Sequence, residues 1–347
     1  MRDDDILILR GDEIASILAG QESKVIEAVR LAYVTHRAGD SSLPHSSFLR
    51  FPGNDTNRII ALPAYLGGDF RAAGIKWIAS FPGNLDKGLD RASAVVILNS
   101  TETGRPRALL EGSIISARRT AASAALAAKT LHADEEVARV SLLGCGVINF
   151  EIVRFLQILF PRIKSLTVFD IDPKRAGQFK QRCQDAFAEL EVSVAKDVNA
   201  ALRSSPLISI ATTAIEPHIF DLSPCAAGST ILHISLRDLS PEAILSSDNI
   251  VDDIDHVCRA KTSVHLASEL AGTRSFIRCT LADILTGATT PRETESRVAV
   301  FSPFGLGVLD LAVSMLVYDL GIKQNRGTII KSFLPDGPAP HTGGKES

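Results

Sequence analysis

Two glycines and one carboxylate have the types and the spacing of a dinucleotide-binding site. Gly144 and Gly146 follow an apolar segment, residues 140–143, and precede a run compatible with a helix. In such a turn the first glycine permits the sharp bend, and the second lets the backbone approach a pyrophosphate lying on the amides of the next helix. Asp170 ends a second apolar segment about 24 residues after Gly146, near the separation expected for a ribose-binding acid. An ordinary strand–turn–helix is the alternative, and Asp170 favours the dinucleotide site.

The identity of the acid at position 170 predicts which dinucleotide is bound. A carboxylate accepts a hydrogen bond from the 2′-hydroxyl of NAD and repels the 2′-phosphate of NADP, so NAD is predicted, although the basic Lys174 and Arg175 follow. Asn149 stands where a third glycine usually lets helix and strand pack closely, and we expect it to push the helix slightly away. The residues predicted to contact NAD are Thr120, Gly144, Gly146, Val147, Ile148, Asn149, Asp170, Ala211, Thr212, Thr213 and Ser235.

Three basic residues, Arg50, Lys76 and Arg119, stand in segments whose other residues are typical of a protein interior. A buried cation needs a counter-charge, and no acidic residue lies close to any of the three in sequence. We therefore expect substrate carboxylates as partners, which arginine can hold through two parallel hydrogen bonds. Taken singly, each is more often a solvated or salt-bridged side chain, so the prediction depends on their joint occurrence.

One further acid, Asp238, follows a predicted parallel strand at its carboxyl end, where ligands collect in open α/β sheets. A carboxylate in this place is a candidate general base. A helix N-cap is an equal alternative, because Ser240 and Pro241 follow closely. His45 and His233 are predicted to be structural, since neither has a nucleophile or ligand cluster within sequence reach.

Size, charge and cysteine content restrict the class of protein. The chain has 347 residues, 45% hydrophobic and 22% charged, which is enough for two domains. Its net charge of -3 gives no general attraction to nucleic acid or to an anionic membrane. The five cysteines are scattered without Cys-x-x-Cys spacing, so neither a disulfide framework nor a metal site is expected. With no signal-peptide pattern and no apolar run of membrane-spanning length, a cytoplasmic protein is predicted.

The order of secondary-structure signals predicts an α/β protein. Residues 24–38 suit a helix, residues 44–111 suit an antiparallel meander with hairpins around 52–57 and 101–104, and the alanine-rich residues 113–131 suit one long helix. From residue 139 on, strands near Val140, Leu166, Val192, Leu207, Thr230 and Asn249 alternate with helices, as in a Rossmann doubly wound parallel sheet. An apolar helix at 305–320 could return to the first domain. We predict a Rossmann domain at 119–305 and a discontinuous α+β substrate and dimerisation domain at 1–118, completed by 306–347.

The order of these motifs resembles the ornithine cyclodeaminase and mu-crystallin family across nearly the whole chain. The motifs are Lys76 in a β segment, Thr103-Gly104 in a turn, Arg118-Arg119-Thr120-Ala121-Ala122, the Gly144 turn and Asp238. The resemblance implies a Rossmann domain that binds NAD(H) or NADP(H), and a homodimer formed through the other domain. By motif match it also implies that Arg50, Lys76 and Arg119 bind substrate carboxylate and that Asp238 is the catalytic acid/base.

A narrower resemblance points to the branch of this family that makes 2,3-diaminopropionate for siderophores of the staphyloferrin B type. Residues 48–52, 57–68, 74–78 and 80–84 carry it. Two positions depart from ordinary members, which usually have Gln-Ala where this chain has Ile148-Asn149, and Gly-x-Asp where it has Leu236-Arg237-Asp238.

This branch implies NAD-dependent oxidative cleavage of N-[(2S)-2-amino-2-carboxyethyl]-L-glutamate to L-2,3-diaminopropionate, 2-oxoglutarate and NADH. A tricarboxylate amino-acid substrate would explain the three cations, with Arg58 or Arg237 as further binders. Asp238 would take the amine proton or activate water, and Lys76 would hold a carboxylate and bias nearby pKa values, so both are predicted to be catalytic. The alternatives are an ornithine cyclodeaminase, a non-catalytic mu-crystallin-like binder, and an alanine or cyclic-imino-acid dehydrogenase.

Overall fold

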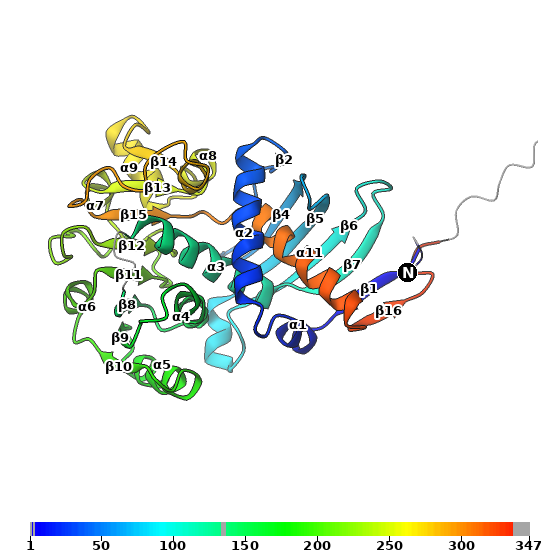
Figure 1. The fold of residues 1–347 in the computed structure, drawn as a ribbon, viewed down its shortest axis with the longest axis horizontal. Coiled ribbons are helices and arrows are strands. Elements are labelled where there is room, and N and C mark those ends of the chain that lie inside the picture. The colour runs from blue at the N-terminus through cyan, green and yellow to red at the C-terminus, as the bar shows by residue number, and fades with distance from the viewer. Residues whose placement is uncertain (1, 3, 133–136, 336–347) are drawn as a thin grey trace, which may run out of the picture. The chain divides into compact units, whose positions relative to one another are not determined.

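Eight short strands form a parallel sheet, called sheet B here, in a computed structural model that describes residues 2, 4–132 and 137–335 (Figure 1). Its spatial order is β10 (Glu191–Val194), β9 (Ser165–Phe169), β8 (Arg139–Leu143), β11 (Leu207–Ile210), β12 (Thr230–His233), β15 (Ala299–Ser302), β13 (Asp248–Val251) and β14 (Ile277–Thr280). Four of these strands, β11, β12, β13 and β15, are buried at every residue, as expected for a parallel sheet covered on both faces. The predicted Rossmann topology is confirmed, with β14 and β15 in addition.

Helices connect and cover these strands. They are α2 (Glu22–Arg37), α3 (Ser113–Leu131), α4 (Val147–Leu159), α5 (Pro173–Ala186), α6 (Val198–Ser204), α7 (Pro241–Leu245), α8 (Ile254–Val257), α9 (Ser263–Ala271) and α10 (Leu281–Leu285). Several begin at a side-chain cap: Asp172 caps α5 and Asp197 caps α6, because a carboxylate accepts the otherwise unpaired amides of a first turn. The parallel strand order reverses between β8 and β11, which is where α/β sheets bind ligands.

The second sheet, sheet A, is mostly antiparallel. Its order is β16 (Thr328–Ile330), β1 (Ile6–Leu9), β7 (Pro106–Glu111), β6 (Ala92–Asn99), β5 (Ala72–Ser80), β4 (Asn54–Leu66) and β2 (Ser41–Ser42), with β3 (Ser47–Phe51) also paired to β4. Only β1 and β7 pair in parallel. The helices α1 (Gly11–Ile17) and α11 (Gly307–Lys323) and a 3₁₀ turn (Pro82–Lys87) accompany it. Both predicted hairpins, β3–β4 and β6–β7, are confirmed.

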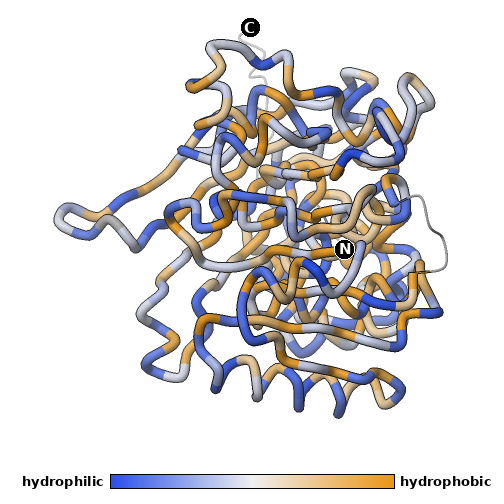
Figure 2. Tube along the Cα trace, turned by 90° about the vertical axis from the view of Figure 1, so that its left-hand side faces the viewer, coloured by the Kyte–Doolittle hydropathy of each residue, from blue (hydrophilic) through white to orange (hydrophobic). Residues whose placement is uncertain are grey.

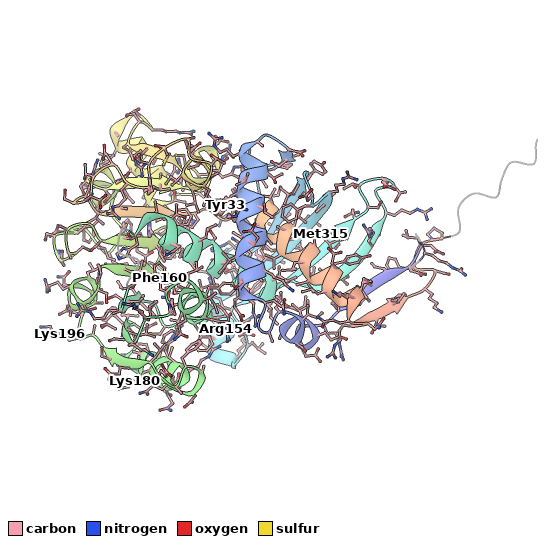
Figure 3. All side chains as sticks on the ribbon, viewed as in Figure 1. Tyr33, Arg154, Phe160, Lys180, Lys196 and Met315 are labelled. Atoms are coloured by element: carbon pink, nitrogen blue, oxygen red, sulfur yellow. The ribbon has the colours of Figure 1, made fainter. Side chains whose placement is uncertain are left out.

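The two faces of sheet A differ in burial. Register places Leu62, Lys76, Val96 and Leu110 in one row, and of these Lys76, Val96 and Leu110 are buried. The next row, on the opposite face, contains Ala61, Trp77 and Val95, and Trp77 and Val95 remain 40% and 37% exposed. Helix α11 packs on the buried face, where the position of a Cβ on Gly74 would lie 3.2 Å from Leu311; Figure 3 labels Met315 on this helix.

Compactness divides the chain into two units. One comprises residues 1–19, 41–115 and those from 310 on, and the other comprises residues 20–40 and 116–309. The sequence suggested boundaries at 118/119 and 305/306 and placed residues 20–40 in the first domain. Helix α2 instead joins the Rossmann unit, because Tyr33, labelled in Figure 3, hydrogen-bonds through its hydroxyl to Ser123 Oγ at 2.7 Å and is fully buried.

Hydropathy along the chain agrees with the burial of its residues. Hydrophobic stretches concentrate in the interior of the trace, and hydrophilic stretches are commonest on outer loops and helices (Figure 2). Among the described residues, no helix combines the length and apolar character needed to cross a membrane.

Candidate active site

The turn after β8 has the backbone of a pyrophosphate site. Gly144 has φ +91°, and a Cβ there would lie 2.4 Å from the carbonyl oxygen of Ala211, so only glycine fits. Gly146 is the N-cap residue of α4, and no atom lies within 4 Å of the position its Cβ would take. Open space at Gly146 therefore adjoins the start of this 13-residue helix, which suits a phosphate group.

Asn149 replaces the usual third glycine with hydrogen bonds. Its buried side chain donates through Nδ2 to the carbonyl oxygens of Leu143 at 2.9 Å and Gly144 at 2.7 Å, and its Oδ1 accepts from Ser209 Oγ at 2.7 Å. The sequence suggested that Asn149 would push α4 away from the strand. The structure shows the side chain joining the first turn of α4 to β8 and β11, because an amide can satisfy three buried polar groups at once.

Asp170 lies beside the same turn, as its position in the sequence predicts. Its Oδ2 accepts a hydrogen bond from the backbone amide of Cys145 at 2.8 Å, and its Oδ1 accepts one from the amide of Asp172 at 3.1 Å. The Nε atom of Arg175 lies 4.0 Å from Oδ2, so the basic residue noted in the sequence does reach this carboxylate. Burial and the charge of Asp170 raise the pKa of Cys145 to about 12.

The end of β11 connects the glycine turn to Asp238. The amide of Ala211 donates to the carbonyl oxygen of Leu143 at 2.9 Å, and the hydroxyl of Thr212 donates to Asp238 Oδ1. Ser235 Oγ donates to Asp238 Oδ2 and lies 3.1 Å from the carbonyl oxygen of Ile210. Two predicted cofactor residues, Thr212 and Ser235, therefore contact the predicted catalytic acid, and Ala211 pairs with the strand before the glycine turn.

The other predicted cofactor residues are less closely connected. Val147 and Ile148 form the first turn of α4, and Val147 is half exposed. Thr213 is exposed in the loop after β11. Thr120 lies on α3, where its hydroxyl donates to the carbonyl oxygen of Ser116 within the helix at 2.7 Å; this bond gives it a structural role in its own helix.

Asp238 is a fully buried carboxylate whose oxygens face several donors. Besides Thr212 and Ser235, His218 Nε2 lies 3.1 Å from Oδ1 and His233 Nε2 lies 3.4 Å from Oδ2. Burial would raise the pKa of Asp238, but the hydrogen bonds from His218 and Ser235 and the nearness of His233 hold it well below its usual range. The caps of α7 and α8 are Ser240 and Asp253, so the alternative of Asp238 as an N-cap is wrong.

His218 is the residue of this cluster that sequence reasoning missed. It belongs to the loop after β11, whose amides at His218 and Ile219 both donate to the backbone carbonyl of Asp238 at 2.9 Å. This pairing brings the loop to Asp238 across 20 residues of sequence. His233, predicted to be structural, is fully buried and contacts Ser302 Oγ at 3.2 Å and the amide of Asp238 at 3.3 Å.

A strained residue precedes Asp238. Leu236 has φ +68° and is buried, and its carbonyl oxygen accepts from the amide of Ser263 at 2.7 Å. This is the position where a Gly-x-Asp sequence would supply glycine, so the chain keeps the left-handed backbone without the residue that adopts it freely. Such a conformation costs a bulky residue roughly 1 kcal/mol or more.

Lys76 has a counter-charge within the protein. Its Nζ lies 2.8 Å from Asp310 Oδ2, and the two side chains are 3% and 1% exposed. The sequence suggested a substrate carboxylate as the counter-charge of Lys76, and the structure shows a protein carboxylate beside it, from an acid 234 residues away in sequence. A role of Lys76 toward substrate stays a prediction.

Arg50 and Arg58 are directly opposite each other on β3 and β4. The sequence suggested that Arg50 lies in a buried segment, but β3 is largely exposed because it pairs only with β4. Burial and the nearby charge of Arg50 lower the pKa of Arg58. Within the described residues, neither arginine forms an ion pair, and the sheet register places both on the same face as Lys76.

Arg119 is buried on α3 against a glycine of the Rossmann unit. A Cβ on Gly305, which has φ +93°, would lie 3.0 Å from Arg119 Nη1. The amides of Phe304 and Gly305 donate to the buried carboxylate of Asp252 at 2.9 and 2.7 Å. Arg237, the other residue considered for substrate, donates through Nη2 to the carbonyl oxygen of Ala260 at 2.9 Å. Among the described residues, no group of three or more His, Cys, Asp or Glu side chains could hold a metal.

Comparison with known proteins identifies the family. The model of the ornithine cyclodeaminase/mu-crystallin family matches residues 18–325. The chain belongs to this family. It is 28% identical over 335 residues, covering 95% of this chain and 99% of the relative, to N-((2S)-2-amino-2-carboxyethyl)-L-glutamate dehydrogenase of Staphylococcus aureus.

Solved structures of the family share the whole fold. Δ¹-pyrroline-2-carboxylate reductase of Thermococcus litoralis, in complex with NADH and L-proline, gives a TM-score of 0.87 at 26% identity, covering 93% of this chain and 99% of that one. An archaeal alanine dehydrogenase dimer with bound NAD gives 0.83 at 28% identity, covering 94% and 99%. The predictions of family, of fold class and of an NAD-dependent enzyme are confirmed at this level.

Proposed function

We propose that this protein catalyses the NAD-dependent oxidative cleavage of N-[(2S)-2-amino-2-carboxyethyl]-L-glutamate, called the conjugate below. The products are L-2,3-diaminopropionate, 2-oxoglutarate and NADH. The chain is an oxidoreductase of amino-acid substrates that uses NAD, as its relatives do. The S. aureus relative, which matches over nearly its whole length, supports cleavage of the conjugate as the specific reaction. Diaminopropionate of this origin would supply a siderophore or a peptide natural product.

The observation that carries this choice of substrate is the pair Arg50 and Arg58. Like charges opposite each other on neighbouring strands are destabilising, and an anion bound between or beside them would offset that repulsion by Coulomb attraction. Lys76 lies on the same face, four residues along β5 from Ser80, the residue opposite Arg58. Proline and alanine have one carboxylate each, whereas the conjugate has three, which matches a face with several cations.

The cofactor residues fit NAD. The Gly144 turn and the first amides of α4 would hold the pyrophosphate, and Asp170 would accept a hydrogen bond from the ribose hydroxyl. NAD⁺ supplies the acceptor for the hydride that leaves the glutamyl α-carbon. We propose Arg50, Lys76 and Arg119 as substrate-carboxylate binders, with Arg58 beside Arg50, and Asp238 and Lys76 as the residues that control protons and charge.

We also propose a homodimer formed through the half-exposed face of sheet A. Leu49, Tyr65, Trp77 and Val95 all project from that face and are 46%, 36%, 40% and 37% exposed. Contiguous apolar surface of this kind marks an interface, and the archaeal alanine dehydrogenase is described as a dimer. We propose the cytoplasm as its location, because all five cysteines are unpaired.

A product assay tests the reaction. Purified protein is given NAD⁺ and the conjugate, and NADH, 2-oxoglutarate and diaminopropionate are measured; the proposal expects equal amounts of all three. L-ornithine, L-alanine and L-proline are assayed in parallel. Proline formed from ornithine without accumulation of NADH would identify a cyclodeaminase. NADH formed only from alanine or proline would identify a simpler dehydrogenase, and NAD binding with no turnover of any substrate would identify a binding protein.

A matched pair of variants tests the substrate. Arg58→Gln removes one cation of the opposed pair, and Arg105→Gln removes a half-buried cation that follows the β6–β7 turn. We expect Arg58→Gln to raise KM for the conjugate at least about tenfold, the effect of one charge-assisted hydrogen bond, while Arg105→Gln leaves KM unchanged. An unchanged KM in both variants would remove the arginine pair as support for a substrate with three carboxylates.

A further inference from the structure

Among the described residues whose side chains contact the Asp238 carboxylate, His218 is the most exposed; Thr212 and Ser235 are only partly exposed. Asp238 and His233 are 0% exposed, whereas the His218 side chain is 39% exposed. Its Nε2 points at Asp238 Oδ1, and its Nδ1 has no hydrogen-bond partner among the described residues. The imidazole therefore has one nitrogen for the carboxylate and one available to a ligand.

Asp238 itself is poorly suited to take a proton from a substrate. Oδ1 already accepts from Thr212 and His218, and Oδ2 accepts from Ser235 beside His233. A buried carboxylate with its lone pairs used in this way is stabilised in its ionised form. It can orient an imidazole and stabilise the imidazolium, as the buried acid of an acid–histidine pair does in other enzymes.

We propose that His218 is the catalytic base of this enzyme and that Asp238 is the positioning residue behind it. This inference rests on the proposed function, because it assigns the proton acceptor for an amine substrate. Imidazole is the side chain most often used for general base catalysis. The charged and titratable groups around His218 are Asp238, His233 behind that carboxylate, and Glu216, two residues earlier in the same loop.

The loop geometry holds His218 at the cofactor end of sheet B. Backbone pairing of Ile219 with Leu239 fixes the loop to the segment that carries Asp238. Thr212, which begins this loop, contacts both sides of the arrangement: its backbone lies 3.1 Å from the position of a Cβ on Gly144, and its hydroxyl donates to Asp238. The glycine turn, Thr212, Asp238 and His218 are thus joined by direct contacts within one unit.

The secondary amine of the conjugate enters as an ammonium ion, and His218 takes one N–H proton, which frees the nitrogen lone pair. Oxidation then makes the carbon–nitrogen bond double, water adds to that carbon, and the carbon–nitrogen bond breaks as the hydroxyl proton moves to nitrogen. The sum is conjugate, NAD⁺ and water giving 2-oxoglutarate, diaminopropionate as its ammonium ion, NADH and H⁺. The proton taken by His218 is the H⁺ released to solvent.

The test compares His218→Gln and His218→Ala with a matched histidine variant. Gln keeps a donor toward Asp238 but cannot take a proton, and Ala leaves space for an added base. His265→Gln is the control, because His265 is a partly exposed histidine on α9 that contacts Glu269 instead.

We expect His218→Gln to lower kcat by roughly 10²–10⁴-fold, the usual size of general base catalysis, with NAD affinity and melting temperature unchanged. Added imidazole should restore part of the activity of His218→Ala, and the acid limb of the pH profile should disappear in His218→Gln.

A labelling readout does not depend on turnover. Diethyl pyrocarbonate should modify His218 in the free protein, and the conjugate with NADH should protect it, whereas His265 should be modified equally with and without ligands. A fully active His218→Gln variant would overturn the proposal. So would a His218→Gln variant of low activity that keeps the acid limb or loses NAD binding, or a His218→Ala variant whose activity added imidazole does not raise, because each result indicates a structural role.

Substrate choice and base assignment can be separated in this experiment. The variants are assayed with whichever of the conjugate, L-alanine or L-proline the wild-type protein oxidises. If the wild-type protein oxidises alanine and not the conjugate, the proposed function fails. The role of His218 is then still tested by imidazole rescue and by the pH profile of alanine oxidation. If wild type oxidises none of them, the catalytic assignment of His218 is overturned together with the function.

Discussion

The two sheets of this protein place their functional polar groups in different ways. In sheet B, polar side chains gather at the carboxyl ends of the strands, and each finds its partners nearby: Asp238 contacts Thr212 and His218, 26 and 20 residues away. In sheet A the comparable buried charge, Lys76, pairs with Asp310 across 234 residues. The parallel sheet builds a site from its own loops, whereas the antiparallel sheet depends on a helix contributed much later in the chain.

Removing Asp310 tests the buried ion pair of sheet A, for which we expect the largest effect on stability. Asp310→Ala leaves the Lys76 ammonium buried beside an empty position, and breaking one partner of a buried pair typically costs about 3–5 kcal/mol. We expect faster hydrogen exchange in peptides of β5 and β6, with peptides of β11 and β12 little affected. The double variant Lys76→Met/Asp310→Leu should recover most of the loss, because no charge is left unpaired. A loss below about 1 kcal/mol in the single variant would contradict this account of the pair.

Sheet A also has a half-exposed face, whereas the central strands of sheet B are buried throughout. A charge introduced on the half-exposed face of sheet A tests whether that face is a dimer interface. Trp77→Glu places a carboxylate in the middle of the row that contains Ala61 and Val95. We expect the dimer to weaken by roughly 2 kcal/mol or more, about 30-fold in dissociation constant. The measurement is sedimentation equilibrium, with Leu270→Glu, a change at a 59% exposed residue of α9, as control. If both variants dimerise with the same dissociation constant as the wild-type protein, the interface lies elsewhere.

The smallest expected effect concerns an ion pair at the end of sheet B. His256 Nδ1 lies 2.9 Å from Asp253 Oδ1, and His36 Nε2 lies 3.5 Å from Oδ2. The hydrogen bond to Asp253 raises the pKa of His256. Burial would raise the pKa of Asp253, but the bonds from His256 and His36 lower it overall.

The signs of these shifts define a pH window. A raised histidine pKa gives stability that is complete below about pH 6.5 and is lost as pH rises through the folded-state value; a lowered aspartate pKa gives stability that is complete above about pH 3.9 and is lost as pH falls. Both contributions are therefore complete between about pH 4 and 6.5. In melting curves from pH 5 to 9, His256→Asn should lose most relative to wild type at the acid end. Parallel curves across that range would show that the pair contributes nothing.

The sequence predicted the backbone of the Gly144 turn and the position of Asp170 better than the surroundings of Arg50 and Lys76. Gly144, Gly146 and Asp170 are identifiable because a glycine turn depends on local backbone and a fixed spacing; their roles toward NAD stay predictions. His218 carried no signal of its own, since the pairing of Ile219 with Leu239 that delivers it is a tertiary contact. Short buried strands such as β14 and β15 were missed because an apolar run of four residues does not distinguish a strand from a helix or loop.

For the cations, the error had a physical cause. A search for acids near Lys76 in the sequence could not find Asp310, because long-range ion pairs leave no periodic pattern. Arg50 was predicted to be buried from its apolar neighbours, yet β3 pairs with β4 alone and presents those neighbours to solvent. Asn149 was interpreted by its size, whereas its three hydrogen bonds explain its place.

The long separation between Lys76 and Asp310 sets an order of events on the ribosome. At roughly 5–20 residues per second, the ammonium on β5 must wait about 10–50 s before its carboxylate has been synthesised. Nearly all of the Rossmann unit, residues 116–309, is made in that interval and can fold while β4 to β7 still lack α11. Strand β16, which pairs with β1, comes later still. The nascent chain therefore acquires its nucleotide-binding half first, and the apolar surface of the other half reaches its final form only when the last helix and strand have been added.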